Sequence, residues 1–110
     1  MSYDCYMEID TGGKYRATVA DIGNMTSNVS PMWTKAIGRR LSECEGMTGA
    51  DLAPLLEAAI ADMDDPSRRR EYEALSPANG WGSVLGARDY LYDILVACRE
   101  HPKAVFHASH

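Results

Sequence analysis

The sequence predicts an α+β fold in which a small three-stranded antiparallel sheet carries about four helical segments on one face. Three observations support this: residues 3–19 alternate apolar and polar side chains around a glycine turn, the middle of the chain has helical periodicity, and residues 103–109 alternate again. At 110 residues the chain has room for one domain and one modest core. Strands this few and short cannot pack helices on both faces, so we expect a single domain over residues 1–110 with the helices on one side.

A β-hairpin is predicted first. One face of residues 3–10 carries the apolar side chains Tyr3, Cys5, Met7 and Ile9. A three-residue loop, Thr11-Gly12-Gly13, with glycine in the left-handed conformation would pair Asp10 with Lys14. In that register Met7 and Ile9 are buried, and a slip by one residue would mix the two faces.

The segment 22–30 follows, and its short polar side chains are typical of a loop. Ser30 is then the expected N-cap of a short helix, with Pro31 at the first helical position and Gly38 near the end. A second helix is expected to begin at Thr48, which heads a capping-box pattern, and to run to about Asp62. Pro54 would bend this helix or move its regular part to about Asp51.

The second half of the chain shows the same kinds of helix-start and helix-end signals. Asp65-Pro66 begins a short helix that Ser76-Pro77 ends, and Ser83 caps a long helix that runs to about His101. Leu91 lies near the middle of the apolar stripe of this helix, which is the longest in the chain. Pro102 stops the helix, and residues 103–109 form the third strand.

Composition and charge exclude several classes of function. The net charge of -5 opposes general binding to nucleic acid, because phosphate backbones repel an acidic chain. Apolar runs are too short for a membrane span, and the N-terminus lacks the pattern of a secretory signal. The three cysteines are odd in number and widely spaced, which indicates reduced thiols in the cytoplasm.

The candidate site consists of two polar loops that each contain a tryptophan and lead into a helix N-terminus. Free backbone N–H groups at such ends can bind anions, and an indole can stack on a planar ring. Together the loops could form a pocket for a small ligand or a partner, with the candidate residues Asn24, Thr26, Ser27, Asn28, Trp33, Asn79 and Trp81. The alternative is that the polar residues only cap helices and make turns, while the tryptophans fill the core.

Other chemistry is weakly indicated. No catalytic nucleophile with a base, no metal-ligand set and no cofactor motif is visible, so we expect no cofactor and no metal. Cys5 and Cys98 are expected to be buried and inert, whereas Cys44 is expected to be more exposed. The arginine run 68–70 is expected to form a solvated face in which Arg69 pairs with Glu73, and the acids Asp62, Asp64 and Asp65 are expected to form a charged loop.

One resemblance spans nearly the whole chain. It rests on the hairpin Asp-Thr-Gly-Gly at 10–13, the stretch 26–33, the Asn-Gly-Trp-Gly segment at 79–82 and the ending 97–102. In these segments the sequence resembles small uncharacterised proteins of actinobacterial phages and related mobile elements. The resemblance implies a phage origin and a small accessory role inside a bacterial host, and it assigns no catalytic residue.

The functional hypothesis is a non-enzymatic, cytoplasmic binding protein that recognises a small ligand or a host protein through the two tryptophan loops. A first alternative is a small enzyme that acts on a nucleotide-like substrate through the same loops. The lack of a nucleophile and base pair in the sequence favours binding over catalysis. A second alternative is a homodimer built on a sheet edge or on exposed apolar helix surface.

Overall fold

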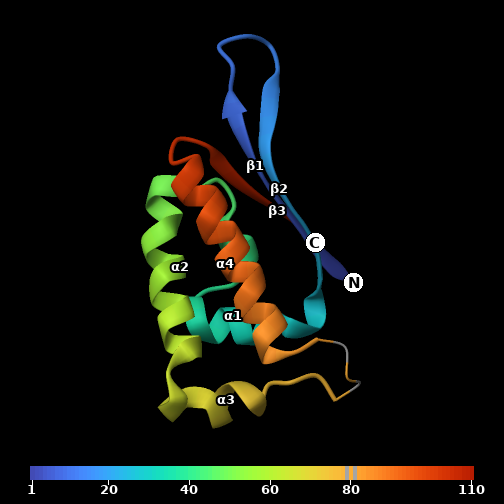
Figure 1. The fold of residues 1–110 in the computed structure, drawn as a ribbon. Helices are drawn as coiled ribbons and strands as arrows, with labels where there is room; N and C mark the ends of the chain where they lie inside the picture. The colour runs from blue at the N-terminus through green and yellow to red at the C-terminus, as the bar shows by residue number, and fades with distance from the viewer. Residues whose placement is uncertain (79, 81) are drawn as a thin grey trace.

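The computed structural model describes residues 1–78, 80 and 82–110, and it confirms the predicted α+β fold. Strands β1 (Ser2–Asp10), β2 (Arg16–Thr26) and β3 (Val105–Ser109) form one antiparallel sheet in the order β2-β1-β3. The helices lie against one face of the sheet, as predicted, and the β1–β2 hairpin extends beyond them as an arm (Figure 1).

The helices follow the predicted order. Their bounds are α1 Ser30–Ile37, α2 Gly49–Asp64, α3 Arg69–Glu73 and α4 Val84–Glu100, with short 3-10 turns at Ser27–Val29, Leu41–Cys44 and Pro66–Arg68. Three predicted end signals are confirmed. The Thr48 hydroxyl accepts the N–H of Asp51, the Ser83 hydroxyl accepts the N–H of Gly86, and Gly38 ends α1 in the left-handed conformation with φ 85°.

Two details of the helices differ from the prediction. Ser30 is the first residue of α1 and not its N-cap, because the preceding 3-10 turn runs directly into the helix. The capping side chain lies earlier, at Thr26, whose hydroxyl accepts the N–H of Asn28. Helix α2 is helical from Gly49, directly after the predicted cap, so its regular part does not wait until Asp51; it contains Pro54 and ends at Asp64, two residues beyond the expected end.

The register of the hairpin differs from the predicted one. Asp10 pairs with Arg16, not with Lys14, so the loop has five residues, 11–15. Side chains close this longer loop: the Thr11 hydroxyl donates to the carbonyl of Tyr15 at 2.7 Å, and the Asp10 carboxylate accepts the N–H of Gly12 at 2.8 Å. The arm extends past the helices, so Ile9 is 37% exposed and its predicted burial is wrong, whereas Met7 is fully buried as expected.

The second strand is longer than predicted. It continues to Thr26, so the turn-forming residues from Ile22 onward belong to a bulged strand and the predicted loop 22–30 begins too early. At Gly23, with φ 90°, the N–H donates to the Asp21 carboxylate at 3.0 Å and the carbonyl accepts from the Tyr90 hydroxyl at 2.7 Å. The bulge therefore satisfies its own backbone groups and anchors β2 to α4.

The core lies between the sheet and the helices. It is centred on large side chains with almost no exposed surface: Met7, Met32, Trp33, Leu41, Leu52, Leu56, Tyr72, Leu91, Ile94 and Phe106. Helices α2 and α4 pack side by side along most of their lengths (Figure 1). Because all these helices lie on one side, the opposite face of the sheet is left open.

Candidate functional site

Trp33 is a core residue and does not line an open site, contrary to the prediction. Its side chain has no exposed surface, and the indole N–H donates to the carbonyl of Ala87 at 3.0 Å. The ring meets Tyr3 edge-on and stacks on Tyr90. An indole enclosed in this way cannot stack on a ligand, so the core-filling alternative applies to this residue.

The two predicted loops do meet. A Cβ atom placed on Gly82 would lie 2.6 Å from a methyl carbon of Val29 and 3.3 Å from the methyl carbon of Thr26. The close approach therefore requires a residue without a side chain at this position. Asn79 and Trp81, the candidate residues of the second loop, lie outside the described residues, so the shared site stays a prediction.

The other candidate residues lie at the end of β2. Asn24 is exposed and pairs with Asp4 of β1, Thr26 caps the following turn, and Ser27 and Asn28 form that turn. Paired residues of neighbouring strands point to the same face, so Asn24 and Asp4 share the face of the sheet that is turned away from the helices. The predicted polar loop thus leads onto the open face of the sheet.

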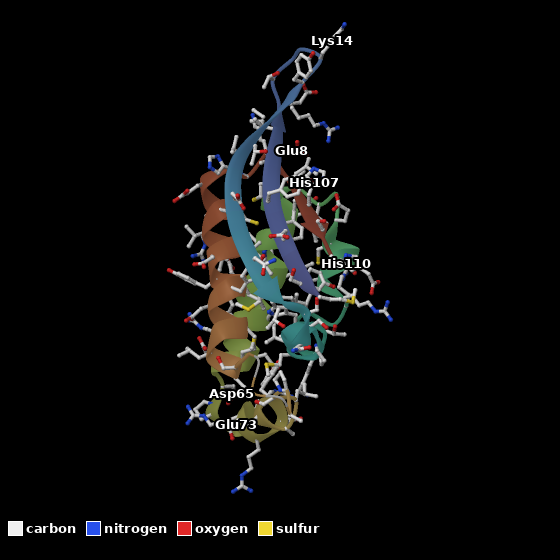
Figure 2. All side chains as sticks on the ribbon, turned by 90° about the vertical axis from the view of Figure 1, so that its right-hand side faces the viewer. Glu8, Lys14, Asp65, Glu73, His107 and His110 are labelled. Carbon is white, nitrogen blue, oxygen red and sulfur yellow. The ribbon has the colours of Figure 1, made fainter. Side chains whose placement is uncertain are left out.

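This open face is a second candidate surface of the fold. Cys5 and Met7 point into the core, so the alternate residues Asp4, Tyr6 and Glu8 point outward. Figure 2 looks onto this side, where the sheet lies in front of the helices. Among the described residues no helix covers it, and the sheet pairing adds Asp21 from β2 and His107 from β3, both beside Tyr6.

His107 is held at the centre of the open face. Its Nδ1 lies 2.5 Å from a carboxylate oxygen of Glu45, and its Nε2 lies 2.9 Å from a carboxylate oxygen of Glu8. The Nε2 contact has ion-pair distance without hydrogen-bond alignment, so we treat it as the weaker of the two. The imidazole also stacks on the Tyr6 ring, with 5.0 Å between the ring centroids.

Glu45 fixes this arrangement from outside the sheet. Its second carboxylate oxygen accepts the N–H of Ala108 at 2.9 Å, so one side chain clamps both the backbone and the imidazole of β3. The result is an acidic surface that carries the stacked rings of Tyr6 and His107. Sequence reasoning missed it because Glu45 and His107 are 62 residues apart, although the strand alternation already placed polar side chains on this face.

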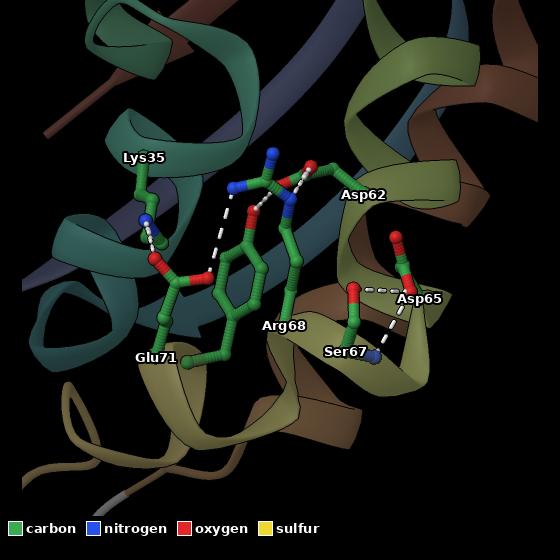
Figure 3. Close-up of polar contacts among 7 residues, drawn as sticks. Lys35, Asp62, Asp65, Ser67, Arg68 and Glu71 are labelled. Atoms are coloured by element: carbon green, nitrogen blue, oxygen red, sulfur yellow. Dashed lines mark hydrogen bonds and ion pairs between the residues drawn. The ribbon is translucent and has the colours of Figure 1, made fainter.

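The acids at the end of α2 have structural partners. Asp62 accepts hydrogen bonds from the Tyr72 hydroxyl and pairs with Arg68 at 2.8 Å, and Asp65 accepts from the N–H and hydroxyl of Ser67 (Figure 3). Asp64 holds the Arg88 guanidinium with two contacts of 3.0 Å. Local ion pairs and a turn therefore account for these carboxylates.

The arginine run behaves differently from the prediction at one point. Its ion pairs within the described residues are made by Arg68, which contacts Asp62 and also Glu71 at 3.6 Å. Glu71 in turn pairs with Lys35 of α1 at 3.3 Å (Figure 3). Arg69 and its expected partner Glu73 both line a pocket of about 580 Å³ between α2, α3 and α4.

All three cysteines are free and buried, which corrects the expectation that Cys44 is more exposed. Burial raises the pKa of Cys5 and Cys98 to about 11 from an ordinary 9.0, and burial also raises the pKa of Cys44. The thiolate is the reactive form of cysteine, so these thiols are poor nucleophiles at neutral pH.

We therefore expect a disulfide-exchange reagent to modify the native protein very slowly at neutral pH and all three thiols at once after denaturant is added. The thiolate that the reagent releases, followed over time, measures the rate of modification. Native reaction as fast as that of free cysteine would contradict the burial of these residues.

The raised pKa values also make stability depend on pH. Because unfolded thiols ionise near 9.0 and two folded ones near 11, the free energy of unfolding should fall as pH rises through this interval.

No group of three or more His, Cys, Asp or Glu side chains in the described part of the chain is arranged to hold a metal ion. Of the helices described, none combines the length and the apolar character needed to cross a bilayer. Comparison with protein-family models, with curated proteins and with solved structures finds no match.

Proposed function

We propose that the chain is a non-enzymatic protein-binding module whose open sheet face binds a basic segment of a partner protein. The observation that carries the proposal is the acidic face itself, on which four carboxylates lie around the stacked rings of Tyr6 and His107: Asp4, Glu8, Asp21 and Glu45. Aromatic side chains with a charged rim are typical of protein interfaces.

The charge of the face selects the class of partner. Carboxylates attract lysine and arginine side chains and repel phosphate groups, so a basic protein segment fits and a nucleic-acid backbone does not. The candidate residue Asn24 lies at one end of this face and adds a side-chain amide to it. The alternative of an enzyme for a nucleotide-like substrate loses the stacking residue Trp33, which is buried.

The setting is part of the same proposal. The resemblance to phage proteins suggests a partner among the proteins of a bacterial host, in the cytoplasm. Such an accessory protein acts by occupying a surface of its partner, and it needs neither a cofactor nor a catalytic residue.

A charge reversal on the face tests the proposal. We expect Asp4→Lys to weaken binding of a fluorescent Lys/Arg-rich peptide by about tenfold, because it removes an attraction and adds a repulsion at an exposed position. Fluorescence anisotropy in moderate salt measures the affinity. Glu73→Lys makes the same change of charge on α3 and should leave the affinity nearly unchanged.

Two results would overturn the proposal. One is equal weakening by Asp4→Lys and Glu73→Lys, which would indicate attraction to net charge alone. The other is equally tight binding of a matched acidic peptide, which the carboxylates of the open face should repel.

A further inference from the structure

The two edges of the sheet differ in how they are closed. Beside β3, the segment before α2 acts as a partial fourth strand: the Gly46 N–H donates to the Phe106 carbonyl at 2.9 Å, and the Phe106 N–H donates to the Met47 carbonyl at 2.8 Å. Strand β2 forms the other edge and has no strand beside it among the described residues. An uncovered edge offers unpaired backbone groups to another strand.

Only the first part of the β2 edge is open in this way. Around Gly23 the backbone groups are already bonded to Asp21 and Tyr90, so a new strand cannot pair there. The stretch 16–21 precedes this bulge and runs into the projecting arm. A two-stranded arm without further packing is only marginally stable in water, so a partner strand would stabilise it.

We propose that this stretch pairs with the same stretch of a second copy of the chain, forming a symmetric dimer with a continuous six-stranded sheet. The sequence of the stretch is Arg-Ala-Thr-Val-Ala-Asp. In an antiparallel arrangement Arg16 of each copy lies opposite Asp21 of the other, and Ala17 lies opposite Ala20. Opposite charges face each other at both ends, Ala17 and Ala20 meet next to them, and Thr18 lies opposite Val19 at the centre.

A second register shift, which leaves Val19 without a partner on β1, puts the two charged residues on the same face. Arg16 pairs with Asp10 of β1, and Asp21 pairs with Tyr6, so both side chains lie on the open face. Ala17 and Ala20 pair with Ile9 and Met7, which places both on the helical face. In a regular strand, residues 16 and 21 would lie on opposite faces, because side chains alternate. The irregularity between them removes this conflict.

A groove beside the β2 edge can receive the tip of the arm of the second copy. It has a volume of about 380 Å³ between β2 and α4, with apolar walls that include Ile22 and Val96 and with carboxylates from Asp93 and Glu100. The chain of the second copy continues from Arg16 toward this groove with Tyr15, which is 80% exposed. Lys14 then brings a positive charge toward the acidic rim.

The size of the contact sets the expected strength. Six residues of edge pairing and two arm ends bury less than the roughly 1,200 Å² of a standard interface, so we expect a weak dimer that dissociates on dilution. The dimer edge shares Asp21 with the open face, but it pairs backbone groups along β2, whereas the proposed partner binds side chains of the face. The peptide test substitutes Asp4 and the dimer test substitutes Arg16 and Asp21, so one proposal can fail while the other holds.

A charge exchange provides the test. We expect Arg16→Asp and Asp21→Arg each to weaken self-association at least about tenfold, because each sets like charges opposite one another. An equimolar mixture of the two variants should associate again, since every contact in the mixed dimer joins opposite charges. Sedimentation velocity over a range of concentrations measures this, and circular dichroism checks that each variant is folded.

Two further variants keep the outcome clear. Arg70→Asp makes the same change of charge as Arg16→Asp on the exposed side of α3 and should associate like the unmodified protein. Asp21→Asn retains an acceptor for the Gly23 N–H, so it weakens the dimer without opening the bulge. A monomeric unmodified protein at every concentration, or a mixture no more associated than its components, would overturn the proposal.

Discussion

Replacing Leu91 with alanine is expected to lower the free energy of unfolding by about 2–5 kcal/mol. Leu91 has no exposed surface and lies in the middle of α4, the helix that packs against both α2 and the sheet. Truncating it leaves a cavity inside the packed core, and the surrounding structure can fill this cavity only in part. A domain of this size has a total stability of about 5–15 kcal/mol, so the loss is a large share of it.

Chemical denaturation of the two proteins measures this difference. The matched control is Leu85→Ala in the same helix, because Leu85 is 68% exposed and loses few contacts on truncation. We expect the control to change the free energy of unfolding by less than about 0.5 kcal/mol. An unchanged midpoint for Leu91→Ala, or equal effects of the two substitutions, would show that α4 is not the central packing element.

Local signals predicted the helices well. Thr48 and Ser83 begin helices because their hydroxyl groups accept the backbone N–H three residues ahead, and Gly38 ends one because it adopts a positive φ at low cost. Each of these interactions involves neighbours in the sequence. The sequence pattern therefore contains most of the information that sets these ends.

The hairpin shows where local patterns fail. Its faces were predicted, but its register depends on side chains that close a five-residue loop and on a bulge at Gly23 that Tyr90 stabilises from 67 residues away. A short glycine loop and a longer one with side-chain closure both fit the same alternation. Only contacts with α4 decide between a loop and a bulged strand at residues 22–26.

The candidate site was predicted only in part. The polar end of β2, including Asn24, lies on the proposed binding face, whereas Trp33 belongs to the core. A tryptophan near a polar loop can serve either purpose, and the position of the surrounding helices decides which. The contact between Glu45 and His107 joins two distant segments, so no spacing in the sequence indicates it.

Gly49→Ala is expected to destabilise the protein by about 1–3 kcal/mol, even though alanine is the better helix former. Gly49 is the first residue of α2, and its N–H donates to the carbonyl of Ala104 at 2.8 Å. A Cβ atom there would lie 2.6 Å from the carbonyl oxygen of His101 and 2.8 Å from that of Cys98. Both are backbone atoms at the end of α4, so they cannot move aside as a flexible side chain can.

Two effects of opposite sign compete at this position, and their sizes decide the outcome. Helix propensity favours alanine over glycine by about 1 kcal/mol, whereas relieving the clash requires the start of α2 to move away from the end of α4, although its N–H groups are bonded to the carbonyls of Pro102 and Ala104 just after that helix. Gly13→Ala is the control, because the nearest atom to its added Cβ is the Thr11 hydroxyl oxygen at 3.9 Å. Thermal unfolding should show a lower midpoint for Gly49→Ala and little change for Gly13→Ala. A higher midpoint for Gly49→Ala would mean that propensity outweighs the contact and that the start of α2 is not fixed against α4.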